Sequence, residues 1–146
     1  MAFNSEKVIL GTHATIKLNG ELVAEATGLE AKVTIKKEEV KMLGDIHTRY
    51  KIVGLEGKGT LKLNKVYSRF IDLLSDDMKD GKDTVCTIES LLADPKSDGT
   101  EGILLKDCIF DELTLADFEA GKIGDRSYPF TFSDWEVNET IDVPTP

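Results

Sequence analysis

The chain has 146 residues, the length of one ordinary domain, and its hydrophobic fraction of 40% and charged fraction of 31% are typical of a soluble globular protein. It carries 18 basic and 27 acidic side chains, and residues 94–146, with 4 basic and 13 acidic side chains, account for the whole net charge of −9. Binding to nucleic acid by charge needs a cationic surface, so this composition argues against specific nucleic-acid binding.

The sequence also argues against membrane and secreted classes. No apolar run approaches the roughly 18 residues of a membrane-spanning helix. The N-terminus, MAFNSEKVILGT, lacks the basic and apolar regions of a signal peptide. Two cysteines, Cys86 and Cys108, lie in strand-like runs and indicate buried free thiols in a reducing compartment rather than a metal site.

The first regular element is a β-hairpin over residues 12–27, preceded by an N-terminal arm, residues 1–11, that we expect to be flexible. Asn19-Gly20 at the centre of the hairpin is a residue pair that type I′ turns favour. Residues 28–37, GLEAKVTIKK, are predicted to form the next strand, because apolar and polar residues alternate along them.

The alternation then fails, and we expect a long loop at residues 40–51. Loops of this length inside a compact domain are usually functional or flexible. The apolar side chains of the loop show no period that could form a local core, so we expect it to be mobile in a free monomer and ordered by contact with another copy. The residues assigned to this contact are Val40, Met42, Leu43, Asp45, Ile46, His47, Arg49 and Tyr50.

A second strand, residues 52–64, contains VGLEGKGTLKL, which at first sight suggests a phosphate-binding loop. The spacing is wrong for such a loop, because Lys58 is followed by Gly59 and no helix opens at Thr60. Gly57 and Gly59 instead share one face with the leucines, which is the period of a half-buried strand. Glycine inside a strand indicates a bulge, a bend or the close approach of another group.

One helix is predicted, over residues 65–80, because apolar residues recur there at helical spacing. Asn64 could cap its start, and Gly81 fits its C′ position. We interpret its apolar stripe as core packing. The stripe consists of Val66, Phe70, Leu73, Leu74 and Met78.

The remaining chain returns to strands, at residues 83–93, 103–118 and 126–137, and ends in a loose tail at residues 138–146. There is no internal repeat and no second domain. About seven strands and one helix predict a single-domain, mainly β protein, an antiparallel β-sandwich or barrel with one packed α-helix.

The search for catalytic chemistry finds no convergent polar constellation. His13 and His47 are the only histidines, and neither has a cysteine or serine partner nearby in the sequence. The loop at residues 94–102 lacks the acidic third position of a calcium-binding loop. We therefore expect no enzyme activity, no cofactor and no metal.

The order of the predicted elements along the chain is more specific than any one of them. The hairpin LNGELVAE, the strands LEAKVTIKKE and YKIVGLEGKGTLKL, the helix YSRFIDLL and the block FDELTLADFEAGKIGDRSYPFTFSDWE follow one another along the chain. Together they resemble the tail tube proteins of contractile phage tails and phage-like bacteriocin particles, in the group typified by PBSX-like prophages. The resemblance covers nearly the whole chain and is most specific over residues 110–135.

This resemblance implies a structural protein with a fold similar to that of the type VI secretion tube protein. Hexameric rings would stack into the inner tube of a contractile tail, a conduit for DNA or a piercing needle. Strands of six copies would join into one inner β-barrel, in which Gly57 and Gly59 let a curved sheet pack closely on a second layer. The strand faces that could line the channel carry Glu30, Lys32, Thr34, Lys36, Glu56, Lys58, Thr60 and Lys62.

The resemblance also implies partners and a location. The partners would be further copies of the chain, the tail sheath protein, and the baseplate and tape-measure proteins. The chain would be made in the bacterial cytoplasm and end in an assembled tail or phage-like particle. The alternative, which the residues leave open, is a monomeric β-barrel that binds a small ligand in an apolar cavity.

Overall fold

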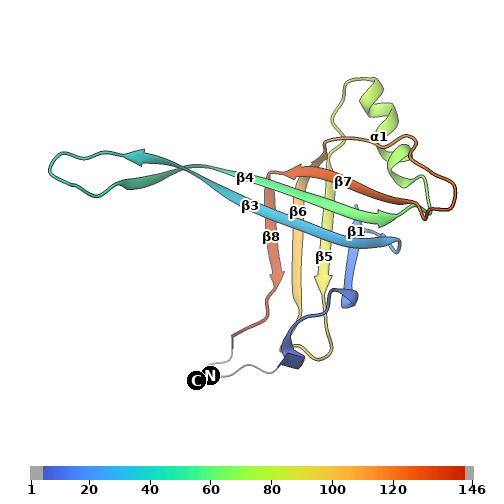
Figure 1. Cartoon of the computed structure of the whole chain (residues 1–146), viewed down its shortest axis with the longest axis horizontal. Coiled ribbons are helices and arrows are strands. Elements are labelled where there is room, and N and C mark those ends of the chain that lie inside the picture. Colours follow the sequence, from blue (N-terminus) through green and yellow to red (C-terminus); the bar gives the residue numbers. More distant parts are fainter. Residues whose placement is uncertain (1–4, 144–146) are drawn as a thin grey trace.

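A computed structural model describes residues 5–143 of the chain. Over this range the protein is mainly antiparallel β-sheet with one α-helix, which confirms the predicted fold class (Figure 1). Residues 1–4 of the predicted N-terminal arm and 144–146 of the predicted tail lie outside this range. The strands and the helix are β1 (Ala14–Leu18), β2 (Glu21–Leu22), β3 (Ala26–Val40), β4 (Arg49–Asn64), α1 (Arg69–Lys79), β5 (Cys86–Leu92), β6 (Glu101–Phe110), β7 (Asp125–Phe132) and β8 (Asp134–Glu139).

Strand β6 belongs to two sheets that run across each other. A first sheet has the order β2-β1-β5-β6-β8, and a second has the order β6-β7-β4-β3. Strand β6 pairs with β8 over Gly102–Lys106 and with β7 at Ile109 and Phe110. Between these stretches Asp107 has a φ of 55°, a left-handed conformation that Asp tolerates better than most residues. This corner turns the strand from the first sheet into the second, as in orthogonal sheet packing.

The core lies between the two sheets and combines aliphatic side chains with a cluster of aromatic rings. Phe70 of α1 stacks on Tyr128 with 4.1 Å between ring centroids and meets Phe110 edge-on at 4.9 Å. Phe110 in turn meets Phe130 edge-on at 5.6 Å. Such contacts add about 0.5–1.5 kcal/mol each beyond the burial of their area. The helix therefore closes one end of the sandwich by placing one ring between β6 and β7.

The predicted turn and helix end are confirmed, but the helix begins later than expected. Asn19 and Gly20 have φ of 51° and 86°, the positive values that a type I′ turn needs. Gly81, with a φ of 69°, donates its N–H to the carbonyl of Met78 and forms the predicted C′ residue. The helix starts at Arg69 with Ser68 as N-cap, so Asn64 is not its cap and Val66 is an exposed residue ahead of it.

Two predicted strand boundaries are also wrong. Strand β6 ends at Phe110, and residues 111–124 form an irregular segment where strand had been expected up to residue 118. The predicted strand 126–137 is two strands, β7 and β8, which meet at Ser133 and belong to different sheets. A pattern of alternating residues does not reveal such a break, because both strands keep the same period.

The two longest strands, β3 and β4, form a hairpin that projects beyond the sandwich (Figure 1). Strand β7 covers β4 only as far as the pair Gly57↔Phe132, so residues 34–56 extend past the second sheet; we call them the arm. The predicted loop is shorter than 40–51. Val40 pairs with Arg49, and only residues 41–48, the tip, are outside the strands.

The glycines of β4 make room for the aromatic rings of β7. A Cβ on Gly59 would lie 2.5 Å from Phe130 Cζ and 2.5 Å from the carbonyl oxygen of Glu30. A Cβ on Gly57 would lie 2.6 Å from Phe132 Cε2. Each glycine directly faces its phenylalanine across the β4–β7 ladder. The close approach that the sequence indicated therefore comes from rings on the neighbouring strand, not from a second layer.

We predict that Gly59→Ala lowers the free energy of unfolding by about 1–3 kcal/mol, the usual cost of overpacking a core. The added methyl group collides with a backbone oxygen and with a ring that is 1% exposed, and neither can move freely. Chemical denaturation measures the effect. Gly54→Ala on the same strand is the matched control, because nothing lies within 4 Å of its Cβ position. Equal effects of the two substitutions would contradict the packing role of Gly59.

A second prediction concerns the helix. Phe70→Ala should cost about 3–5 kcal/mol of unfolding free energy, because the ring is buried between Tyr128 and Phe110. Val66→Ala should cost less than about 0.5 kcal/mol, since Val66 is exposed and precedes the helix. A loss below about 1 kcal/mol for Phe70→Ala would show that the helix is not part of the core.

Candidate assembly surface

The register of the β3–β4 hairpin brings all eight predicted lining residues onto one face, which we call the polar face. Glu30 lies opposite Thr60, Lys32 opposite Lys58, and Thr34 opposite Glu56. Lys36 and Lys62 lie opposite the glycines Gly54 and Gly28. Alternation in the sequence was sufficient to place them together, because a strand sends every second side chain to the same side.

The charges of the polar face are arranged in ion pairs around its two glutamates. Lys36 Nζ lies 3.4 Å from Glu56 across the strands, and Lys58 Nζ lies 3.1 Å from the same carboxylate. Lys32 Nζ lies 3.0 Å from Glu30. Hydrogen bonds from Lys58 and then from Lys36 lower the pKa of Glu56, and a hydrogen bond from Lys32 lowers the pKa of Glu30.

The polar face is not the acidic surface that a DNA-repelling lining would require. Three of its four lysines pair with glutamates, both across and along the strands. Four lysines against two glutamates still leave the face weakly cationic, so the excess acid of the chain lies elsewhere.

The opposite face of the arm is open to solvent and carries apolar side chains, with Lys37 and Glu39 among them toward the tip, opposite Ile52 and Tyr50. Ile35, Ile52 and Leu55 are each about half exposed, and Tyr50 is 63% exposed. A register shift between Lys36 and Lys37 changes which residues of β4 share this face, so Tyr50 and Ile52 join it. A β-bulge of this kind bends and twists the hairpin. A free monomer thus exposes a hydrophobic strip that its own core does not cover.

The tip has a definite local structure. Asp45 accepts the backbone N–H of His47 at 2.9 Å and the Nε of Arg49 at 2.9 Å, and these two hydrogen bonds, in that order, lower the pKa of its carboxyl. Gly44 takes a φ of 81°. Met42, Leu43 and Ile46 point into solvent, with Ile46 96% exposed. Of the predicted loop residues, Val40, Arg49 and Tyr50 lie in strands and the other five in the tip.

Both edges of the arm lack a strand partner within the described part of the chain. Strand β3 pairs only with β4, and β4 residues 49–56 pair only with β3. Unpaired edges of this length present rows of free N–H and C=O groups, which single domains normally shorten, cover or charge. An arm with two open edges is the geometry of a sheet that another chain extends.

An open cleft of about 730 Å³ lies between the two sheets. It exists because the sheets cross, so that part of the inner face of the first sheet has no partner layer. Trp135, the only tryptophan of the chain, lines this cleft and is 37% exposed. Sequence reasoning missed the cleft, since no local pattern encodes the crossing. Other residues lining it are Ile16, Val23, Leu29, Ile103 and Leu105.

The N-terminal segment is attached to the loop after β5. The backbone N–H of Leu10 donates to Asp94 Oδ2 at 2.9 Å, and Lys7 forms an ion pair with Asp98. Hydrogen bonds from the backbone of Leu10 and of Lys96 lower the pKa of Asp94. Residues 5–11, part of the N-terminal segment that the sequence predicted to be flexible, therefore have defined contacts within the chain.

The range of residues 5–143 contains no group of three His, Cys, Asp or Glu side chains able to hold a metal ion. None of the helices in the same range is long and apolar enough to cross a membrane. The buried thiol of Cys108 has its pKa raised to about 11 by burial, which disfavours the reactive thiolate.

The described part of the chain is thus a β-sandwich with an open-edged arm, exposed apolar side chains on that arm and an open cleft between its sheets. The family model described as "Phage tail tube protein" matches residues 1–139. The chain is 34% identical over 143 residues to the phage-like element PBSX protein XkdM of Bacillus subtilis (strain 168), covering 97% of both chains. The chain therefore belongs to the phage tail tube protein family and is a structural component of a tail tube.

Solved structures share the fold at low sequence identity. The tube of an extracellular contractile injection system, from a PVC sheath–tube complex in the extended state, matches with a TM-score of 0.73 and 10% identity over 93% of this chain and 95% of that one. A chain of the anti-feeding prophage cap matches with a TM-score of 0.75 and 11% identity over 96% and 95%. These likenesses confirm the fold predicted from the sequence.

We predict that Lys58→Met raises the pKa of Glu56 toward its ordinary value of 4.5, as measured by an NMR pH titration of the monomer. The Lys58–Glu56 ion pair lowers the pKa of Glu56 in the folded state. The pair therefore stabilises the fold above the ordinary pKa of a glutamate, and this contribution is lost as the pH falls through the lowered pKa of Glu56. Lys51→Met, farther along β4 toward the tip, is the control and should leave this pKa unchanged. An unchanged pKa in Lys58→Met would show that the pair does not form in solution.

Proposed function

We propose that six copies of the chain form a ring and that rings stack into the inner tube of a contractile tail. The observation that carries this proposal is the arm, whose two open edges and exposed apolar side chains have no partner strand or layer within residues 5–143. Pairing of arm edges between copies would satisfy the free backbone groups, and closing the sheet into a barrel would remove the edges altogether.

The two faces of the β3–β4 hairpin differ in polarity, and this difference indicates which face would line the channel. When sheets of six copies join, one face must turn toward the channel and the other toward the outer layer. The face with Lys32, Lys58 and their glutamates can remain hydrated, whereas the face with Ile35 and Leu55 gains by burial. The polar face therefore lines the channel, and the apolar face packs against protein.

Three of the four lysines of the polar face are already ion-paired with Glu30 or Glu56, which limits their attraction for DNA phosphates. The lysines of the polar face are neutralised in part by Glu30 and Glu56, and the whole chain carries a net charge of −9. We infer no specific nucleic-acid binding, because tight phosphate binding requires several unpaired cationic side chains. The other partners in this proposal are the sheath, baseplate and tape-measure proteins. Synthesis in the bacterial cytoplasm precedes incorporation into the particle.

The cleft is the one observation that favours a second candidate, a monomeric module that binds a small ligand. Its volume of about 730 Å³ falls within the range of ligand pockets. Size-exclusion chromatography and negative-stain electron microscopy at rising protein concentration separate the candidates. The tube proposal expects rings and tubes with six-fold symmetry, and a species that stays monomeric at every concentration would contradict it.

We predict that replacing residues 41–48 with Asn-Gly abolishes tube growth but leaves the thermal unfolding of the monomer nearly unchanged. The substitution joins Val40 to Arg49, which already pair, through a two-residue turn that favours a hairpin. Only the exposed tip is removed, so the core keeps its contacts. We expect this loss because the tip is the segment that the sequence assigns to contact with another copy, and long tubes formed by the variant in electron micrographs would show that tube growth does not need that contact.

A further inference from the structure

We propose that the tip of one copy docks in the inter-sheet cleft of a second copy, with Met42, Leu43 and Ile46 entering the cleft. This inference rests on the proposed self-assembly and goes beyond it, because it names the surface that receives the tip. Four observations carry it: the order of the tip, the reach of the arm, the shape and chemistry of the cleft, and the charges around both.

The tip is prepared for binding before any partner arrives. Asp45 holds the backbone of His47 and the side chain of Arg49, which fixes the turn between the two strands. Leu43 and Ile46 are left almost completely exposed on this fixed turn. An ordered apolar loop loses little conformational freedom on binding, so burial of its side chains converts efficiently into affinity.

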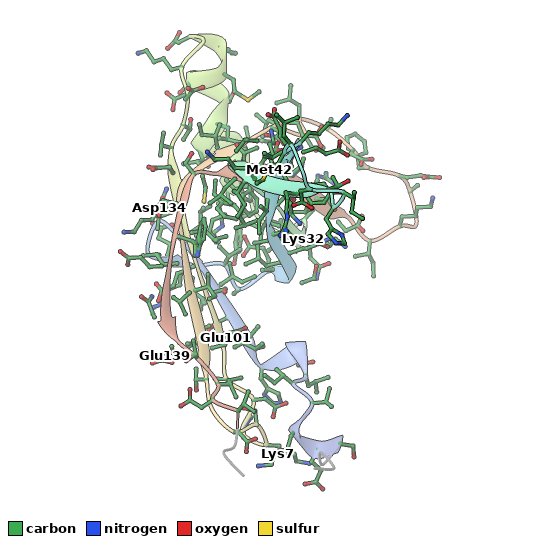
Figure 2. All side chains as sticks on the ribbon, turned by 90° about the vertical axis from the view of Figure 1, so that its left-hand side faces the viewer. Lys7, Lys32, Met42, Glu101, Asp134 and Glu139 are labelled. Atoms are coloured by element: carbon green, nitrogen blue, oxygen red, sulfur yellow. The ribbon has the colours of Figure 1, made fainter. Side chains whose placement is uncertain are left out.

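The arm keeps the tip away from the cleft of its own chain. Strands β3 and β4 remain paired from Ala26↔Leu63 out to Val40↔Arg49, and this paired ribbon points away from the sandwich (Figure 1). Figure 2 views the molecule from the side toward which the arm projects and places Met42 in its upper half, with Glu101 and Glu139 well below. The cleft that receives the tip must therefore belong to another copy.

The cleft offers an apolar surface that lacks a covering layer. It is lined by residues of β3 and of the strands β1, β5, β6 and β8 of the first sheet. Ile103 and Leu105 of β6 form its floor with Trp135 beside them, since Leu105 and Trp135 are paired across the β6–β8 ladder. The polar side chains that line it are mainly hydroxyls, such as Thr15 and Ser90, which suits apolar side chains better than a charged small molecule.

Charge favours the same pairing. Residues 37–51, the tip and the adjoining strand ends, carry four basic side chains, Lys37, Lys41, Arg49 and Lys51, against the carboxylates of Glu38, Glu39 and Asp45, which leaves a net charge of +1. Glu101 is among the residues that line the cleft, and Glu139 lies opposite Gly102 on the next strand. A small cationic excess around the tip thus meets two acidic residues near the cleft, which would orient the encounter.

A contact between two different surfaces of the same chain is heterologous. Such a contact produces closed rings when its rotation closes and open filaments when it does not. Tip-in-cleft docking therefore accounts for why one chain could assemble indefinitely without a second protein. A symmetric dimer, in which two tips meet, would stop after one step.

The single tryptophan provides the first test. Trp135 is at the cleft and partly exposed in the monomer, so tip docking should shield it. We expect a shift of emission to shorter wavelength and weaker acrylamide quenching when dilute monomer assembles into tubes. Tubes in which Trp135 is quenched as readily as in the monomer would overturn the proposal. A small molecule found bound in the monomer, with Trp135 already shielded, would also overturn it.

Cross-linking between copies gives the second test. Copies with Leu43→Cys are mixed with copies with Ser90→Cys, assembled and mildly oxidised; we expect a disulfide-linked heterodimer and none from either variant alone. The background is low because Cys86 and Cys108 are buried. Lys79→Cys, at the end of α1, replaces Ser90→Cys as a control that should not cross-link to Leu43→Cys.

The outcomes separate this inference from the proposed function. Tubes that form normally but give no Leu43→Cys to Ser90→Cys cross-link overturn tip docking and leave the tube function intact. A cross-link between Phe118→Cys and Ser90→Cys in place of the expected one would assign the cleft to the exposed segment 111–124 and also overturn it. Failure of the unmodified chain to assemble at all would contradict the proposed function itself.

Discussion

The fold depends on two phenylalanine rings lying directly over two glycines of the neighbouring strand. Phe130 and Phe132 of β7 occupy the space that side chains at Gly59 and Gly57 would fill, and no larger residue fits there without movement of the backbone or of a buried ring. This contact binds β7 to β4 and continues into the aromatic cluster around Phe70. It also ends at Gly57, and beyond that point β4 continues with only β3 beside it.

The functional surfaces follow from where this packing stops. Because β7 ends at Phe132, residues 34–56 leave the sandwich as a two-stranded ribbon with open edges. Because β6 turns at Asp107 from the first sheet into the second, the sheets cross and leave a cleft beside Trp135. An isolated two-stranded ribbon is marginally stable in water, and its exposed strip of apolar residues adds to that cost. The proposed assembly would offset both liabilities with the same contacts.

The sequence predicted what has a local period and missed what depends on distant contacts. Alternation placed the eight polar-face residues together, and Asn19-Gly20 specified its turn, because both are properties of neighbouring residues. The predicted helix starts too early because Val66 lies four residues before Phe70, a helical spacing, although Val66 precedes the first turn of the observed helix. Tip residues 41–48 were recognised, but strand pairing extends farther than their mixed composition suggests. The break at Ser133 and the corner at Asp107 are set by tertiary pairing and leave no periodic trace.

The central claim is that copies of the chain complete the open edges of the arm, and hydrogen exchange tests it most directly. Amides of residues 33–40 and 49–56 that point away from the hairpin have no acceptor strand in the described range 5–143 of a single copy, so they should exchange rapidly in the monomer. In assembled tubes the same amides should become strongly protected, while core amides such as that of Leu61 remain protected in both states. Outward amides that exchange equally fast in tubes and in monomer would contradict the claim.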